Sequence, residues 1–137
     1  MTGRVAIQTD AAPAAIGAYS QAIRAGNLIF TSGQVGADPT SGALAEGVAA
    51  QAERALRNLA SVLDAAGSGF GRVVKTVIFL VSVDDWATVN EAYARHMVGP
   101  YPARSTVTVR ALPKGALVEI EMVALAGDEP GEPERSW

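Results

Sequence analysis

Cysteine is absent from this chain of 137 residues, and histidine occurs once, as His96. Without cysteine there is no disulfide, no thiolate nucleophile and no zinc site with sulfur ligands. A transition-metal site would need carboxylates almost alone, and the sequence shows no cluster of them. A serine triad would have to recruit His96, and the G-x-S-x-G motif that presents such a serine is missing. We therefore expect no metal, and a structural role for His96 near the end of a helix.

Basic residues are also in the minority. The chain has 11 Lys and Arg against 14 Asp and Glu, a net charge of −3, which leaves no electrostatic footprint for nucleic acid or for an anionic membrane. The N-terminus lacks the apolar segment of a signal peptide. The longest apolar run, residues 73–83, is interrupted by Lys75 and is too short to span a bilayer. These features predict a cytoplasmic protein that binds neither nucleic acid nor membrane.

What is present is the composition of a globular domain: 49% hydrophobic and 18% charged residues. The length suits one domain with a proper core, which we place at residues 1–126. Residues 127–137 contain three Glu, one Asp and two Pro with few apolar residues. This composition predicts a disordered acidic tail.

Hydrophobic periodicity predicts two helices and six strands. The expected order is β-β-β-α-β-α-β-β, with strands at residues 4–7, 19–24 and 27–32, a helix at 46–66, a strand at 73–83, a helix from 84–85 to about 97, and two strands between 102 and 124. This pattern indicates an α+β fold with a single mixed sheet and both helices on one face.

The two helices and the strand between them should supply most of the core. In the first helix, Glu53 and Arg57 have the spacing of an ion pair on the wet side. In the strand, the expected apolar sides are Val77, Phe79 and Val81 on one and Val74, Ile78 and Leu80 on the other. In the second helix, the expected buried stripe is Trp86, Val89, Tyr93 and Met97. One apolar sheet face remains without helices, which predicts that copies of the chain associate.

Residues 102–124 are predicted to form a hairpin with a turn at 112–115. Alternation places Arg104 and Thr106 on one face of it, together with Glu119 and Glu121. The guanidinium of Arg104 could bind the carboxylate of a ligand, or it could pair with one of the glutamates across the hairpin. The two glutamates repel each other mildly, and if one of them is sequestered its pKa should rise, which would favour proton transfer. The alternative is a face that is simply solvated or ion-paired.

Four further residues are candidates for the site. Tyr19 and Ser32 flank the first hairpin and are either polar strand ends or ligand contacts. Gly33 either admits a ligand close to the backbone or marks a bulge. Asn90 lies in the middle of a helix, where asparagine has mediocre propensity, which suggests a specific role.

Several segments, taken in order, resemble the reactive intermediate deaminase (RidA, YjgF) family. They are Ala11-Ala12-Pro13-Ala14-Ala15-Ile16-Gly17-Ala18-Tyr19-Ser20-Gln21-Ala22, Thr31-Ser32-Gly33-Gln34-Val35, Val89-Asn90-Glu91, Pro102-Ala103-Arg104-Ser105-Thr106-Val107, Leu112-Pro113 and Val118-Glu119-Ile120-Glu121. Each is short, but their order and spacing extend over nearly the whole chain. The chain departs from the family pattern at two positions. Ala18 stands where many members of the family have proline, and Thr106 stands where some members have cysteine.

The resemblance implies a homotrimer of the chorismate-mutase-like kind, with sheets forming a central barrel, helices outside and active sites between subunits. Members of the family hydrolyse 2-imino or enamine acids, such as 2-aminoacrylate and 2-iminopropanoate, to 2-keto acids and ammonia without a cofactor. The implied catalytic residues are Arg104, which holds the substrate carboxylate, and Glu119, which acts on the attacking water. The implied substrate-binding residues are Tyr19, Ser32, Gly33, Asn90 and Thr106.

Two other functions are compatible with the sequence. Relatives have been described as endoribonucleases that inhibit translation, although the acidic net charge argues against an RNA substrate. The same cleft could also bind a small carboxylate without turning it over.

Overall fold

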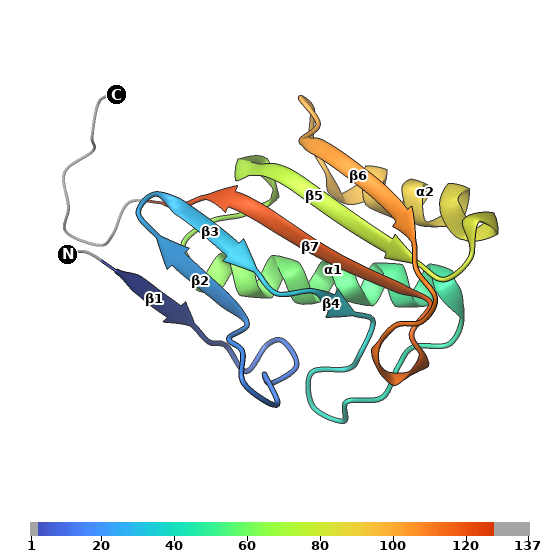
Figure 1. The fold of residues 1–137 in the computed structure, drawn as a ribbon. Helices are drawn as coiled ribbons and strands as arrows, with labels where there is room; N and C mark the ends of the chain where they lie inside the picture. The colour runs from blue at the N-terminus through green and yellow to red at the C-terminus, as the bar shows by residue number, and fades with distance from the viewer. Residues whose placement is uncertain (1–2, 128–137) are drawn as a thin grey trace.

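The structure, a computed structural model, describes residues 3–127. The elements are β1 (Arg4–Ile7), β2 (Ala22–Ala25), β3 (Leu28–Thr31), β4 (Gln34–Val35), α1 (Gly47–Ala65), η1 (Phe70–Arg72), β5 (Val73–Leu80), η2 (Val83–Asp85), α2 (Trp86–His96), β6 (Ala103–Thr108), η3 (Pro113–Gly115) and β7 (Val118–Leu125) (Figure 1). Apart from Gly127, the predicted acidic tail lies outside the described residues. No helix among residues 3–127 is long and apolar enough to cross a membrane.

One seven-stranded sheet has the order β1-β2-β3-β7-β5-β6, and the short β4 pairs with β7 beyond the end of β3. Only β5 and β6 are parallel; the other pairs are antiparallel. Both helices lie on the same side of this sheet (Figure 1). The predicted α+β fold, with one mixed sheet and two helices on one face, is confirmed.

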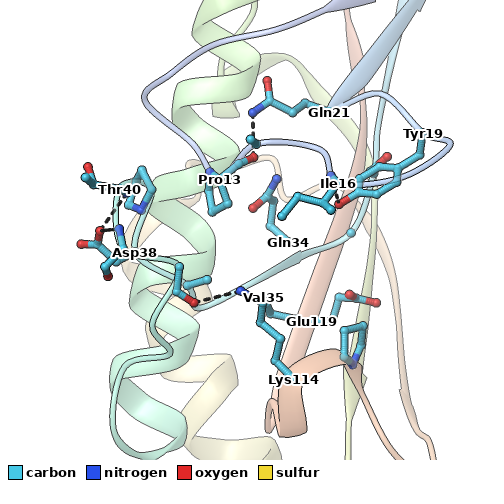
Figure 2. Close-up of a pocket in the computed structure, with 18 residues that line it drawn as sticks. Pro13, Ile16, Tyr19, Gln21, Gln34, Val35, Asp38, Thr40, Lys114 and Glu119 are labelled. Carbon is cyan, nitrogen blue, oxygen red and sulfur yellow. Dashed lines mark hydrogen bonds between the residues drawn. The ribbon is translucent and has the colours of Figure 1, made fainter.

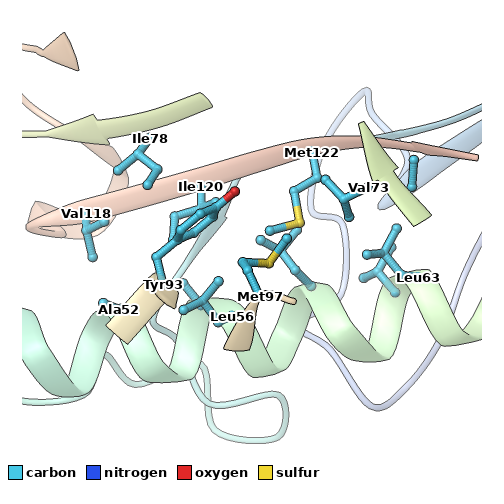
Figure 3. Packing of buried hydrophobic residues seen from close by; sticks show 14 of the residues in the cluster. Ala52, Leu56, Leu63, Val73, Ile78, Tyr93, Met97, Val118, Ile120 and Met122 are labelled. Carbon is cyan, nitrogen blue, oxygen red and sulfur yellow. The ribbon is translucent and has the colours of Figure 1, made fainter. Parts of the chain in front are cut away.

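The core lies between α1, α2 and the helix side of β7 and β5. Leu56, Leu59 and Leu63 of α1 are fully buried and belong to the same cluster as Ile120 and Met122 of β7 (Figure 3). Burying each such side chain stabilises the fold by about 1.5–3 kcal/mol. The first helix is therefore where its apolar spacing predicts.

The solvent-facing side of α1 and the C-terminal end of this helix also agree with the prediction. Glu53 and Arg57 form the expected pair at 3.8 Å. Gly67, with φ of 74°, ends the helix in a conformation that favours glycine.

The central strand β5 departs from strict alternation at its start. A register shift between Val73 and Lys75 leaves Val73 buried and Val74 41% exposed. The expectation that Val74 shares a side with Ile78 is therefore wrong, because a bulge changes the parity of the residues before it. The strand also ends at Leu80, three residues earlier than expected.

The second helix buries Val89, Tyr93 and Met97, as predicted, but Trp86 is 43% exposed. Trp86 is the first residue of α2, and its ring lies beneath the guanidinium of Arg104 on the edge strand β6 instead of in the core. The prediction of a four-residue buried stripe is thus wrong at its first position.

The last two strands do not form a hairpin. β5 lies between β6 and β7: it pairs with β6 in parallel and with β7 antiparallel. Residues 109–117 carry the chain past this intervening strand. The predicted hairpin is wrong because alternation within a strand does not determine which strand lies beside it.

This topology changes which side chains share a face. Arg104 pairs with the buried Thr76 of β5 and therefore lies on the helix side of the sheet, as does Thr106. Glu119 pairs with Phe79 and lies on the opposite side, as does Glu121. The prediction that these arginine and glutamate side chains share a face is wrong, and Arg104 cannot pair with either glutamate of its own chain.

The side of the sheet opposite the helices is covered by no element among residues 3–127; we call it the open face. The apolar side chains that the register places on it include Ile23, Phe30, Val77, Phe79, Val107 and Val123. Phe30 and Val107 are each 44% exposed. The open face has the apolar character that the sequence predicts.

Candidate functional site

One pocket, with a volume of about 860 Å³, lies at the end of the sheet where β4 and β7 meet. Its walls are the loop that contains Pro13, Ile16 and Tyr19, the segment from Ser32 to Gly42, and the η3 turn at Pro113 and Lys114 (Figure 2). Glu119 of β7 completes it, and we call it the Glu119 pocket. Four residues predicted for the site, Tyr19, Ser32, Gly33 and Glu119, therefore come together.

Glu119 lies between two neighbouring strands, opposite Val35 of β4 and Phe79 of β5. Gly33 is so near that a Cβ added to it would lie 2.7 Å from the Glu119 carboxyl carbon. Burial raises the pKa of Glu119, and the charge of Glu121 raises it further. A carboxyl that holds its proton at higher pH than usual is suited to exchange protons with a substrate.

Tyr19 and Ser32 use their hydroxyls to hold the pocket loops. The Tyr19 hydroxyl accepts a hydrogen bond from the backbone N–H of Ile16 at 3.3 Å, and the residue as a whole is 54% exposed. The Ser32 hydroxyl donates to the carbonyl of Ser20 at 2.6 Å. Both hydroxyls keep a lone pair for a ligand, because each oxygen has more than one hydrogen-bonding site.

Two residues of the pocket were not singled out from the sequence. Gln21 is 2% exposed, and its side-chain amide donates to the carbonyls of Thr9 and Pro13 at 3.0 and 2.8 Å. Lys114 has a positive φ of 61° and donates from Nζ to the carbonyl of Gly42 at 2.9 Å, across the pocket (Figure 2). The sequence contains no signal for either, because both roles depend on backbone groups that are distant along the chain.

A second group of predicted residues lies on the helix side, between α2 and β6. Nη1 of Arg104 donates to Oδ1 of Asn90 at 2.8 Å. The guanidinium carbon lies 5.0 Å from the centre of the Tyr93 ring and 5.5 Å from that of Trp86. We call these residues, together with Thr106, the Arg104 group.

The Arg104 group has unused polar capacity. In the part of the chain that the structure describes, no carboxylate lies within ion-pair distance of Arg104. Oγ1 of Thr106, on the same side of β6, is buried and has no hydrogen-bonding partner there. Since the aromatic rings and Asn90 already orient the guanidinium, its remaining N–H groups can bind a planar anion such as a carboxylate.

The residues predicted for one site thus divide into two groups within a single chain. Arg104, Asn90 and Thr106 lie on the helix side of the sheet, whereas Glu119 and the Glu119 pocket belong to the other side. Within one chain, the sheet therefore lies between the two groups.

His96 belongs to neither group. Its Nε2 lies 2.8 Å from Oε2 of Glu53, so the pair connects α2 with α1, and Phe70 meets its ring edge-on. This hydrogen bond is the main cause of a lowered pKa of Glu53. The geometry agrees with the predicted structural role. Within residues 3–127, no three His, Asp or Glu side chains are grouped so as to hold a metal ion.

Comparison with known proteins agrees with this geometry. Residues 9–126 match the model of the family described as Endoribonuclease L-PSP. A protein of Rattus norvegicus named 2-iminobutanoate/2-iminopropanoate deaminase is 50% identical over 125 residues, which cover 90% of this chain and 91% of the relative. A protein of the same name from Salmonella typhimurium is 45% identical over 122 residues, covering 87% and 95%.

Solved structures show the same relationship. RidA from a Psychrobacter species superposes with a TM-score of 0.86 at 46% identity, covering 88% of this chain and 98% of that one. TdcF of E. coli, in a structure with bound serine, superposes with a TM-score of 0.85 at 38% identity, covering 90% and 99%. The chain belongs to the Endoribonuclease L-PSP family, and within it to the reactive intermediate deaminases (RidA, YjgF), as its sequence motifs predict.

Proposed function

We propose that this protein hydrolyses reactive 2-imino acids and their enamine tautomers, such as 2-iminopropanoate and 2-aminoacrylate, to 2-keto acids and ammonia without a cofactor. The observation that carries the proposal is a pair of complementary groups: an oriented arginine without a carboxylate partner among residues 3–127 and a glutamate of raised pKa in a pocket. Relatives that share half of the sequence are named for this activity. The bound serine of TdcF carries the same α-carboxylate as such a substrate.

The chemistry needs orientation, a placed water and proton transfer. Arg104 holds the substrate carboxylate through two parallel hydrogen bonds, which leaves the C=N group directed toward Glu119. A protonated imine is already electrophilic, so water adds to its carbon while the Glu119 carboxylate accepts one water proton. Glu119 then returns the proton to the nitrogen of the tetrahedral adduct. The C–N bond breaks as the hydroxyl of the adduct gives its proton to Glu119 and the C=O bond forms. One water is consumed and one ammonia leaves.

We infer that the site assembles between subunits of a homotrimer whose sheets form a central barrel. The open face is apolar and uncovered among the described residues, which favours burial against other copies. β6 is the edge strand, so its Arg104 lies where a neighbouring copy can approach. In this assembly the Arg104 group of one copy completes the Glu119 pocket of the next.

The same proposal places the protein in the cytoplasm, as the sequence predicts, with damage control as its role. Pyridoxal-phosphate enzymes such as serine/threonine dehydratase release 2-aminoacrylate. Hydrolysis by this protein would remove that intermediate before it reacts with other molecules.

The test generates 2-aminoacrylate with a serine dehydratase and follows keto-acid formation against a chemical imine trap. Wild-type protein should accelerate keto-acid release, and Arg104→Ala should not. Loss of two charge-assisted bonds of about 1.5–3 kcal/mol each corresponds to a loss of about 10²–10⁴-fold. The exposed Arg110→Ala is the matched control and should retain activity. No acceleration by the wild type would refute the proposed reaction, and full activity of Arg104→Ala would refute the role of Arg104.

A mixing experiment tests the shared site. Arg104→Ala and Glu119→Gln should each be inactive alone, but their co-expression should restore activity. With random assembly, about one interface in four joins an intact Arg104 group to an intact Glu119 pocket. Size-exclusion chromatography with light scattering should show a trimer for each sample. No recovery in mixed trimers would show that the two groups do not act together.

The family description also names an endoribonuclease. The net charge of −3 provides little attraction for a phosphate backbone. RNA cleavage by purified protein that disappears in Glu119→Gln would contradict the preference for an imine substrate.

A further inference from the structure

Few polar side chains are buried in this fold, and most of them surround the Glu119 pocket. The buried polar residues are Gln21, Gln34, Gln51, Asn58 and Thr76. Gln21 and Gln34 line the pocket. Gln51 and Asn58 lie behind it, on the side of α1 that faces the pocket wall, and bond to backbone groups of the surrounding segments.

Asn58 is the most deeply buried of these amides. It is 0% exposed in the middle of α1, where a buried amide weakens the helix unless it is bonded. Its Nδ2 donates to the carbonyls of Val35 and Ala37, at 3.3 and 2.9 Å. Its Oδ1 is buried without a partner among the described residues. A leucine would fill similar space without this unpaired acceptor, so stability alone does not account for asparagine at this position.

The two carbonyls belong to the wall that faces the reacting carboxyl. Val35 pairs with Glu119 across β4 and β7, and both Val35 and Ala37 line the pocket. β4 has only two residues, so its own ladder bonds hold it weakly. Gly36, between Val35 and Ala37, lies against the backbone of Gln51 of α1. A Cβ added to Gly36 would be 2.4 Å from the carbonyl oxygen of Gln51. Asn58 is thus the side chain that ties this short strand to the rigid helix behind it.

We propose that Asn58 is a positioning residue for catalysis, which holds β4 in place beside Glu119 through the carbonyls of Val35 and Ala37. The proposal rests on the imine hydrolysis described above and deepens it. Without the two hydrogen bonds, β4 moves away from β7 and water reaches the Glu119 carboxyl. The carboxyl is then both less well placed and less strongly shielded from water.

Two consequences distinguish this role from a purely structural one. The turnover number falls while KM changes little, because the Arg104 group that holds the substrate is untouched. The acid limb of the pH profile, where kcat/KM falls as pH is lowered, moves to lower pH, because hydration lowers the raised pKa of Glu119. Within one chain, the other charged or titratable groups around Glu119 are Glu121 on the open face and Asp38, Lys114 and Tyr19 in the pocket. In the proposed trimer, Arg104 of the neighbouring copy joins them. None of these groups is altered.

Asn58→Leu tests the proposal, because leucine keeps the branched shape of the side chain and removes both N–H donors. Val62→Ala is the matched control: Val62 lies one turn further along α1, is fully buried in the core, and makes no side-chain hydrogen bond to the pocket wall. At a temperature where both variants are folded, Asn58→Leu should lose about tenfold or more in kcat with KM within about twofold. Its acid limb should shift toward lower pH. Val62→Ala should match the wild type in kcat and in pH profile.

If Asn58→Leu does not fold, Asn58→Ala replaces it in the same comparison. Equal kcat and equal pH limbs for the Asn58 and Val62 variants would overturn the positioning role while leaving imine hydrolysis standing. Absence of hydrolysis by the wild type would instead refute the proposed function. In that case, the ¹³C carboxyl titration of Glu119, assigned with Glu119→Gln, decides the positioning role: a lower pKa in Asn58→Leu supports it, and an unchanged pKa refutes it.

Discussion

Gly33→Ala is the sharpest probe of the Glu119 pocket, because one methyl group is directed at one carboxyl. An alanine Cβ at position 33 would lie 2.7 Å from Cδ of Glu119, 2.9 Å from its Cγ and 3.0 Å from its Oε1. Carbon atoms in contact prefer about 3.5–4.0 Å, so the carboxyl must retreat by about 1 Å. The backbone at Gly33 does not have a positive φ, so alanine adopts it without strain.

The geometry predicts a large loss of activity at almost constant stability. A displacement of about 1 Å in a reacting group costs about 10²-fold in rate, or about 2.7 kcal/mol of transition-state stabilisation. Moving the half-buried Glu119 side chain away from its preferred rotamer costs about 0.5–1.5 kcal/mol. Alanine returns about 0.4–1 kcal/mol by restricting the unfolded chain. The free energy of unfolding should therefore change by about 1 kcal/mol or less.

The assay is keto-acid formation from 2-aminoacrylate, combined with urea denaturation of the same samples. Gly71→Ala is the matched control, because a Cβ there meets nothing within 4 Å and the residue has no positive φ. It should retain wild-type activity. If Gly33→Ala also retains wild-type kcat/KM, Glu119 is not the proton-transfer group in the position described, and the mechanism is refuted.

Four further predictions concern pH and packing. As pH is lowered, the kcat/KM of the wild type should begin to fall at a pH above the ordinary glutamate pKa of about 4.3, because the pKa of Glu119 is raised. Glu119→Gln should lose the activity and, with it, this decline of kcat/KM in acid. The folded state binds the proton of Glu119 more tightly than the unfolded state, so the contribution of Glu119 to stability is lost as pH rises. Glu119→Gln should therefore be more stable than the wild type at neutral pH but not in acid. Gly36→Ala should lose about 1–3 kcal/mol or more in urea unfolding, because its Cβ would lie 2.4 Å from the carbonyl oxygen and 2.5 Å from Cα of Gln51; stability equal to that of the wild type would contradict this packing. The pKa of Glu53 is lowered by His96, so its contribution is present above the ordinary carboxyl pKa and lost as pH falls through the lowered value; Glu53→Gln should cost about 0.5 kcal/mol at neutral pH, and a difference that persists in strong acid would refute the assignment.

The elements that the sequence predicts well are those decided by local physics. The helix expected at residues 46–66 is Gly47–Ala65, because a 3.6-residue apolar period and a glycine stop are both local properties. The first hairpin is also present, with its turn at Gly26. Its strands are shorter than the predicted 19–24 and 27–32. Trp86 and Val74 were assigned to the wrong surroundings, because a helix start near a sheet edge and a β-bulge both interrupt an otherwise regular period.

The candidate site was predicted as a set of residues but not as an arrangement. Motif resemblance selected Tyr19, Ser32, Gly33 and Glu119, and the structure brings these four into one pocket. The contributions of Gln21, Lys114 and Asn58 depend on backbone carbonyls between 8 and 72 positions away, which no local pattern contains.

By itself, the sequence determined the fold class, which follows from periodicity, and the family, which follows from the order of its motifs. The two residues on which catalysis is proposed to depend were implied by the resemblance to that family. It also determined which residues alternate within each strand, except at the bulge that begins β5. Only the tertiary structure decided that β5 lies between β6 and β7, and so that Arg104 and Glu119 occupy opposite faces of one sheet. The physical reason is that alternation relates the residues of one strand, whereas the pairing and relative register of two strands depend on packing across the whole domain.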